Sequence, residues 1–190
     1  KKPQVAKLVM AGFDSVRDCA NTVAEIIKIG VIPAGLEMMD QFAIEASEAF
    51  AQAGYPLGAK ALLLCELDGS KDLVKEDLNK VINILSKASS VRVSENEEER
   101  LLFWKGRKSA FPAVGRLSPD YFCMDGTIPK RFLADVLEKI SSLSAIYELR
   151  VANVFHAGDG NLHPLILYDA AQQGELEKAE DFGNDILKLC

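Results

Sequence analysis

Short apolar runs typical of β-strands alternate along this chain with longer stretches in which apolar residues recur at helical spacing. The expected strands are 5–13, 59–67, 91–93, 121–124 and a hairpin within 150–168, with a short extended piece at 31–33. Expected helices follow Ser15, lie near 40–53, 73–85 and 127–143, and begin near Ser94 and Gly174. Because the strands are few and the clearest pair is a hairpin, the pattern predicts an α+β fold, with helices packed on one face of a mostly antiparallel sheet.

Length and composition restrict the class of protein. With 190 residues, a net charge of −6 and 48% hydrophobic residues, the chain is long enough for one sizeable domain with a real core. Its acidity argues against a general nucleic-acid binder, and its apolar runs are too short to span a membrane. The four cysteines are scattered at positions 19, 65, 123 and 190, which favours a reducing, cytoplasmic setting with thiols used as small core residues.

The segment 156–164, which reads His-Ala-Gly-Asp-Gly-Asn-Leu-His-Pro, contains both histidines of the chain. Asp-Gly between apolar runs predicts a two-residue type I′ turn, which places His156 directly opposite His163. Opposed Cβ atoms lie about 4.5–5.5 Å apart, so both rings can reach one ion at about 2.0–2.1 Å. We therefore predict a metal or catalytic role for this pair, against the alternative that both rings are ordinary hydrogen-bonding residues.

Two further interpretations of this segment are weaker or incomplete. A metal site usually needs three protein ligands, and the nearby Asp159 is expected to serve the turn itself. A phosphate-binding glycine loop at 158–160 lacks the third glycine and the Gly-Lys-Ser/Thr that would support it.

Residues 100–117 hold five Lys or Arg side chains and no carboxylate, interleaved with aromatic residues. A guanidinium binds a small carboxylate through two parallel hydrogen bonds, so Arg107 is a candidate substrate-binding residue. Two alternatives stay open: a solvated basic face that balances the preceding Glu97–Glu99, or a docking surface for partner subunits.

Three motifs in order, residues 104–111, 121–129 and 156–164, resemble the C-terminal domain of FAD-linked 2-hydroxyacid oxidases and dehydrogenases, the bacterial glycolate oxidase branch in particular. The resemblance covers the whole chain and implies ferredoxin-like units that cap the substrate side of an FAD. It implies oxidation of glycolate or D-lactate at carbon 2, with His156 and His163 as ligands of a divalent metal such as zinc, iron or manganese. By the same resemblance Arg107 binds the substrate carboxylate.

The resemblance also implies that residues 1–190 are a fragment, a substrate-capping domain without the N-terminal flavin domain. The family places a Gly-Glu-His-Gly segment, with an acidic ligand and a catalytic histidine, beyond the last helix, so no complete catalytic set is expected here. Cys123 and Leu165 stand where related hydroxyglutarate dehydrogenases have Lys and Asn, which argues against a dicarboxylate substrate.

Other oxidase subunits are possible partners, with membrane association through them left open. The alternative function is a non-catalytic metal-binding or regulatory ferredoxin-like module, since one fold serves many functions.

Overall fold

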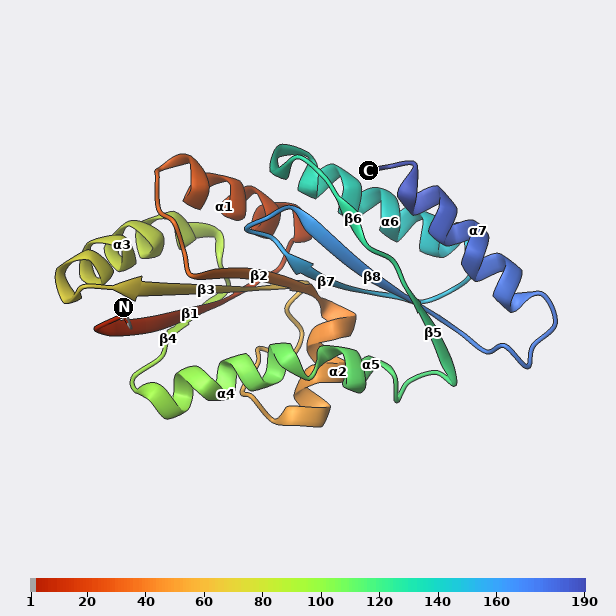
Figure 1. Cartoon of the computed structure of the whole chain (residues 1–190), viewed down its shortest axis with the longest axis horizontal. Helices are drawn as coiled ribbons and strands as arrows, with labels where there is room; N and C mark the ends of the chain where they lie inside the picture. The colour runs from red at the N-terminus through yellow and green to blue at the C-terminus, as the bar shows by residue number, and fades with distance from the viewer. Residues whose placement is uncertain (1–2) are drawn as a thin grey trace.

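The computed structural model describes residues 3–190, and its centre is one eight-stranded sheet in which every pair is antiparallel (Figure 1). The strand order is β4-β1-β3-β2-β7-β8-β5, and β6 pairs with β8. The strands are β1 (Val5–Phe13), β2 (Gly35–Asp40), β3 (Ala61–Gly69), β4 (Ser90–Val93), β5 (Asp120–Cys123), β6 (Gly126–Thr127), β7 (Val151–His156) and β8 (Asn161–Tyr168). The predicted α+β fold with a mostly antiparallel sheet is thus confirmed.

Helices cover both faces of this sheet, so the expectation that they lie on one face was wrong. The larger core cluster holds α1 (Val16–Lys28), α3 (Lys71–Ile84), α6 (Leu133–Tyr147) and α7 (Glu175–Leu187). The other face is covered by α2 (Gln41–Ala51), α4 (Glu97–Lys108) and α5 (Ala110–Val114) (Figure 1). The physical reason lies in the central strands: Leu62 and Leu64 point to one face while Leu63 and Cys65 point to the other, and all four are buried.

Two ferredoxin-like units are joined edge to edge within the sheet. The first unit consists of β1, α1, β2, β3, α3 and β4 in chain order, with α2 inserted between β2 and β3, and the spatial order is β4-β1-β3-β2. The second unit repeats this arrangement with β5, α6, β7, β8 and α7, in the spatial order β5-β8-β7. The units meet where β2 pairs with β7, in a short ladder that opposes Met38 to Phe155 and Met39 to Val154.

The β2 strand was missed by the sequence analysis, which expected an extended piece at 31–33 and then a helix near Asp40. Only the helix was confirmed: Asp40 caps α2 by accepting a hydrogen bond at 2.9 Å from the Ala43 amide. The strand itself occupies Gly35–Asp40 and lies inside the sheet.

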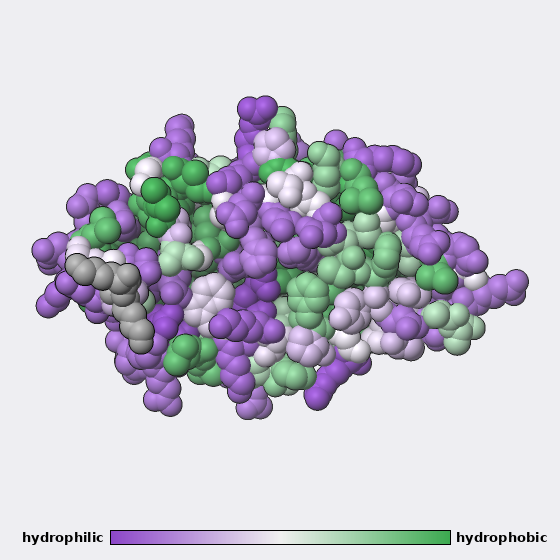
Figure 2. Space-filling view, in the orientation of Figure 1, coloured by the Kyte–Doolittle hydropathy of each residue, from purple (hydrophilic) through white to green (hydrophobic). Residues whose placement is uncertain are grey.

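Most apolar side chains are buried, and burial differs among the four cysteines. Cys19 and Cys65 are buried free thiols, as expected, and Cys123 and Cys190 are exposed free thiols. Figure 2 shows hydrophilic side chains over much of the visible face, with apolar patches between them. Within residues 3–190, no helix has the length and apolar character that a membrane crossing requires.

Candidate functional site

The β7–β8 hairpin differs in register from the sequence prediction. His156 pairs with Asn161, and His163 pairs with Val154, so four residues rather than two form the connection. Direct opposition of the two histidines was therefore wrong. Because the pairing moves by two residues, however, both rings stay on the same face of the sheet. Their centroids lie 5.3 Å apart, with the ring planes at 89°.

Contacts from distant parts of the chain hold the four-residue connection. The Gly158 amide donates to the Leu36 carbonyl at 2.9 Å, and the Ile128 amide donates to the Gly160 carbonyl at 2.9 Å. Gly160 has φ +73°, and a Cβ there would lie 2.3 Å from the Ile128 oxygen. This position therefore requires glycine, and the turn is fixed from both sides.

Glu37, on β2, is the residue that organises the site. Its Oε1 lies 2.8 Å from His156 Nδ1, and its Oε2 accepts hydrogen bonds from Arg107 Nε at 3.1 Å and Nη2 at 2.8 Å. The side chains of Glu37 and Arg107 are only 10% and 8% exposed. The sequence analysis missed Glu37, although an acidic residue between the apolar Leu36 and Met38 is a signal, because a buried carboxylate needs a partner.

His163 is the second ring of the site and has looser polar contacts. Its Nδ1 lies 3.9 Å from Asp125 Oδ1, too far for a hydrogen bond, and its ring meets Phe111 edge-on at a centroid distance of 6.3 Å. Beside the rings, the Oδ1 atom of Asn161 is buried without a hydrogen-bond partner within the described residues. The hairpin thus presents an imidazole and an amide oxygen that a ligand could engage.

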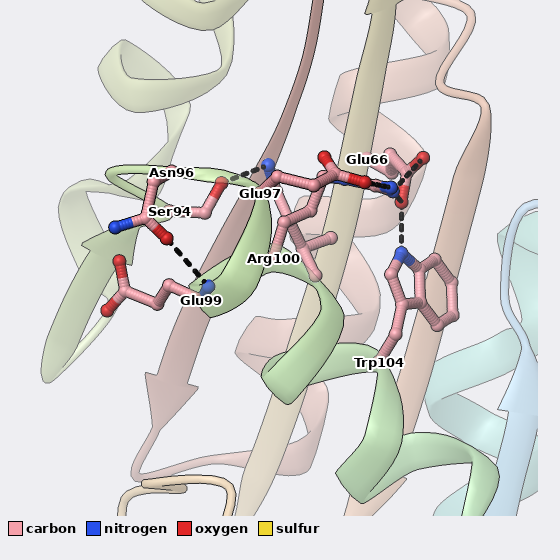
Figure 3. Close-up of polar contacts among 8 residues, drawn as sticks. Glu66, Ser94, Asn96, Glu97, Glu99, Arg100 and Trp104 are labelled. Atoms are coloured by element: carbon pink, nitrogen blue, oxygen red, sulfur yellow. Dashed lines mark hydrogen bonds and ion pairs between the residues drawn. The ribbon is translucent and has the colours of Figure 1, made fainter.

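Helix α4 places Arg107, and contacts with β3 hold the start of that helix (Figure 3). Asn96 caps it by accepting from the Glu99 amide at 2.9 Å, whereas Ser94, the cap expected from sequence, accepts from the Leu8 amide of β1 at 3.0 Å. One turn further on, Arg100 Nη1 donates to both oxygens of Glu66, at 2.9 and 3.0 Å.

Trp104 continues the same face of α4 and also donates to the Glu66 carboxylate (Figure 3). Its ring packs over Gly35, where a Cβ would lie 3.0 Å from two ring carbons. Arg100, Trp104 and Arg107 follow the i, i+4, i+7 spacing of one helix face. Arg100 and Arg107 therefore point to the sheet, while Lys105, Lys108 and Arg116 are exposed. The open alternative of a solvated basic face describes these three residues and not Arg100 or Arg107.

A cavity of about 360 Å³ lies beside the Glu37–His156 contact, between the segment before β2 and the β7–β8 connection. Its polar lining comes from Glu37, Lys130, His156 and Asp159. Outside this cavity lining, burial and then the charge of Asp125 raise the pKa of the Cys123 thiol, which argues against a reactive thiolate there.

The donor set fits part of a metal site. Because Glu37 occupies Nδ1 of His156, the Nε2 atom of that ring is the one left for a ligand, and His163 is close enough to share it. Within residues 3–190, however, no group of three or more His, Cys, Asp or Glu side chains is arranged to hold a metal ion. The two rings would therefore offer two nitrogen donors to such a site, which is fewer than a complete ligand set.

Comparison with known proteins identifies one matching family, and solved structures with the same fold. The family described as "FAD linked oxidases, C-terminal domain" matches residues 2–190. Among curated proteins, the chain is 59% identical to the glycolate oxidase subunit GlcD of Escherichia coli K12 over its whole length, and 36% identical to that of Bacillus subtilis over 94% of its length. It is 27% identical to the mitochondrial D-lactate dehydrogenase [cytochrome] of Arabidopsis thaliana over 95% of its length.

The chain spans only 38% of the two GlcD subunits and 32% of the Arabidopsis protein. Among solved structures, 4-ethylphenol oxidase from Gulosibacter chungangensis aligns with a TM-score of 0.70 at 12% identity, covering 99% of this chain and 44% of that one. p-Cresol methylhydroxylase aligns with a TM-score of 0.69 at 13% identity, covering 98% and 43%. These two likenesses show the fold alone.

Proposed function

Since this chain belongs to the family of FAD linked oxidases, C-terminal domain, we propose that it is the substrate-side cap of an FAD-dependent enzyme. The reaction proposed for the complete protein is oxidation of a small 2-hydroxy acid, glycolate or D-lactate, to the 2-oxo acid. The 59% identity to the glycolate oxidase subunit GlcD supports this substrate class. FAD is bound in the main by a part of the protein outside residues 1–190.

The single observation that carries the proposal is the pair of imidazole rings held side by side on one face of the sheet, 5.3 Å apart, next to a buried Arg–Glu pair. We assign His156 and His163 as ligands of a divalent metal, with zinc, iron and manganese all compatible with nitrogen donors. Such an ion would supply Lewis-acid polarisation of the substrate hydroxyl and carboxylate. The residues themselves orient the substrate for hydride transfer.

Arg107 is the proposed substrate-binding cation. Its Nε and Nη2 atoms are engaged by Glu37, which leaves Nη1 for one oxygen of the substrate carboxylate. Lys130, which lines the 360 Å³ cavity together with Glu37 and His156, adds a second positive charge beside the site. Together they favour an anionic substrate over a neutral alcohol.

Other subunits are proposed partners, because the most similar relatives reported above are named as subunits of glycolate oxidase. Cytoplasmic location, expected from the cysteines, stays a prediction, as does any membrane association through those partners.

The test uses the complete flavoprotein, with His156→Ala and His163→Ala made separately. Anaerobic mixing with glycolate or D-lactate should reduce the flavin in the parent protein and leave it oxidised in both variants, while flavin content is unchanged. Normal reduction in both variants would overturn the assignment.

The alternative function, a non-catalytic metal-binding or regulatory module, is favoured only by the versatile ferredoxin-like topology. Calorimetric titration of this chain with Zn²⁺ separates the two. A tight, complete site within residues 1–190 supports the module, and weak binding by two ligands supports the cap of a larger enzyme.

A further inference from the structure

We infer that Glu37 is a positioning residue for His156, which fixes the tautomer and the direction of that ring, and that Arg107 holds Glu37 in place for this task. The inference rests on the proposed function, since it concerns the ring assigned above as a metal ligand. It adds a role for Glu37 that neither the hairpin motif nor the family match assigns.

The two oxygens of the Glu37 carboxylate have different partners. Oε1 faces His156 Nδ1 at 2.8 Å, and Oε2 receives both hydrogen bonds of Arg107. An ionised carboxylate only accepts hydrogen bonds, so the imidazole nitrogen that faces it carries the proton. The neutral ring then has its lone pair on Nε2, which is the nitrogen that can bind a cation.

The negative charge of Glu37 is buried and must be compensated. Glu37 is 10% exposed, and a carboxylate that is removed from water needs a paired cation and a full set of hydrogen bonds. Arg107 supplies the cation and the two hydrogen bonds to Oε2, while His156 supplies the contact to Oε1. A guanidinium keeps its charge in proteins, and its planar nitrogens fix the direction of the carboxylate. The orientation of His156 therefore depends on Arg107 of α4, which acts through Glu37.

Glu37 and His156 belong to different ferredoxin-like units. Glu37 lies on β2 of the first ferredoxin-like unit, and His156 lies at the end of β7 in the second. The β2–β7 ladder between the units is short, so the carboxylate–imidazole contact adds a further side-chain link across this junction. Glu37 ties the position of the ring to the first unit as well as to its own hairpin.

The experiment compares Glu37→Gln with the matched variant Glu66→Gln in the complete, metal-depleted flavoprotein. Glu66 is a second carboxylate of the same sheet face that is paired with an arginine of α4, but its partners are Arg100 and Trp104 rather than a histidine. Zn²⁺ affinity is measured by competition with a chromophoric chelator at one fixed pH, and thermal melting is measured alongside.

We expect Glu37→Gln to weaken Zn²⁺ binding about 10–100-fold, the range typical for loss of a hydrogen-bond partner of a ligating histidine. We expect Glu66→Gln to change the affinity by less than about threefold, even where its melting temperature falls. Loss of thermal stability in Glu37→Gln with unchanged Zn²⁺ affinity means a merely structural role and overturns the inference.

A companion variant separates the inference from the proposed function. If His156→Ala leaves both Zn²⁺ affinity and flavin reduction unchanged, the proposed function fails. If His156→Ala abolishes both but Glu37→Gln retains parental affinity, the positioning role alone fails. Should Glu37→Gln not fold, the double variant Glu37→Gln, Arg107→Gln removes both buried charges together, and the same loss of affinity is expected from it.

Discussion

The two ends of α4 are attached to the sheet by the same kind of contact, an arginine paired with a carboxylate. At the N-terminal end Arg100 meets Glu66, with side chains 16% and 14% exposed, and Glu66 also receives the Trp104 indole (Figure 3). At the C-terminal end the Arg107–Glu37 pair is more deeply buried, and Glu37 continues to His156.

The difference lies in what the carboxylate touches next. Glu66 gathers two donors from α4 itself, so its contacts end within the packing of helix on sheet. Glu37 receives one donor from α4 and shares its other oxygen with a half-exposed imidazole at the rim of a cavity. The Arg100–Glu66 pair therefore contributes only to the packing of α4 on the sheet. The Arg107–Glu37 pair also contacts His156, the proposed metal ligand.

The largest expected effect is on stability at the site end. We expect Arg107→Ala to lower the free energy of unfolding by about 3–5 kcal/mol, because Glu37 would remain buried without its cation. Arg100→Ala should cost about 1–3 kcal/mol, since Glu66 keeps the Trp104 donor. Urea denaturation measures both values, and equal losses would contradict the difference between the two ends.

A third carboxylate extends the comparison, because Asp40 receives hydrogen bonds from Ala43 and Asn153 but none from an arginine within the described residues. Burial raises the pKa of Asp40 to about 6. The unfolded value is about 3.9, so the folded state binds the extra proton, and this contribution is full below about pH 4 and lost as the pH rises through 6.

We therefore expect the stability contributed by Asp40 to fall by about 1–3 kcal/mol between pH 4 and pH 7. Asp40→Asn keeps the helix cap and should remove this part of the pH dependence. Urea midpoints of parent and variant at both pH values give the test, and parallel pH dependence in the two proteins would contradict it.

Gly106 lies in the last turn of α4 and lets the helix approach the loop that follows α2. A Cβ at this position would lie 2.5 Å from the Tyr55 ring and 2.7 Å from the Ala53 Cβ. Tyr55 cannot easily move, because its hydroxyl donates to the Phe103 carbonyl at 2.6 Å. Gly106→Ala should cost about 1–3 kcal/mol of unfolding free energy and weaken both arginine pairs, which chemical denaturation and a double variant with Arg100→Ala will check.

The smallest expected effect is at the helix start. Asn96→Ala removes the cap and should lower the unfolding free energy by about 1 kcal/mol. Because Arg107 lies three turns further on and has its own partner, Zn²⁺ affinity of the complete flavoprotein should stay within about twofold of the parent. A tenfold loss in this variant would show that the two ends of α4 are not independent.

Local patterns in the sequence were sufficient for most elements. The apolar run at 59–67, the hairpin within 150–168 and the helix after Ser15 all formed, since each depends on spacing and caps among near neighbours. Ferredoxin-like units were also expected, but only through the resemblance.

The turn at 157–160 was the clearest local failure. Asp-Gly predicts a two-residue reversal, but the connection is four residues long because Leu36 and Ile128, both far away in sequence, hold it open through hydrogen bonds. The even shift in register left both histidines on one face, so the feature that matters for the site was predicted although its geometry was not.

By itself, the sequence determined that His156 and His163 share a face of the hairpin, because the period-two pattern of strands is local. Only the tertiary structure decided that Glu37 stands between Arg107 and His156. Arg107 and His156 are 70 and 119 positions away from Glu37, and no spacing rule reaches so far. A buried charge finds its partners only when strands and helices from distant parts of the chain pack together, because that packing removes water from around it.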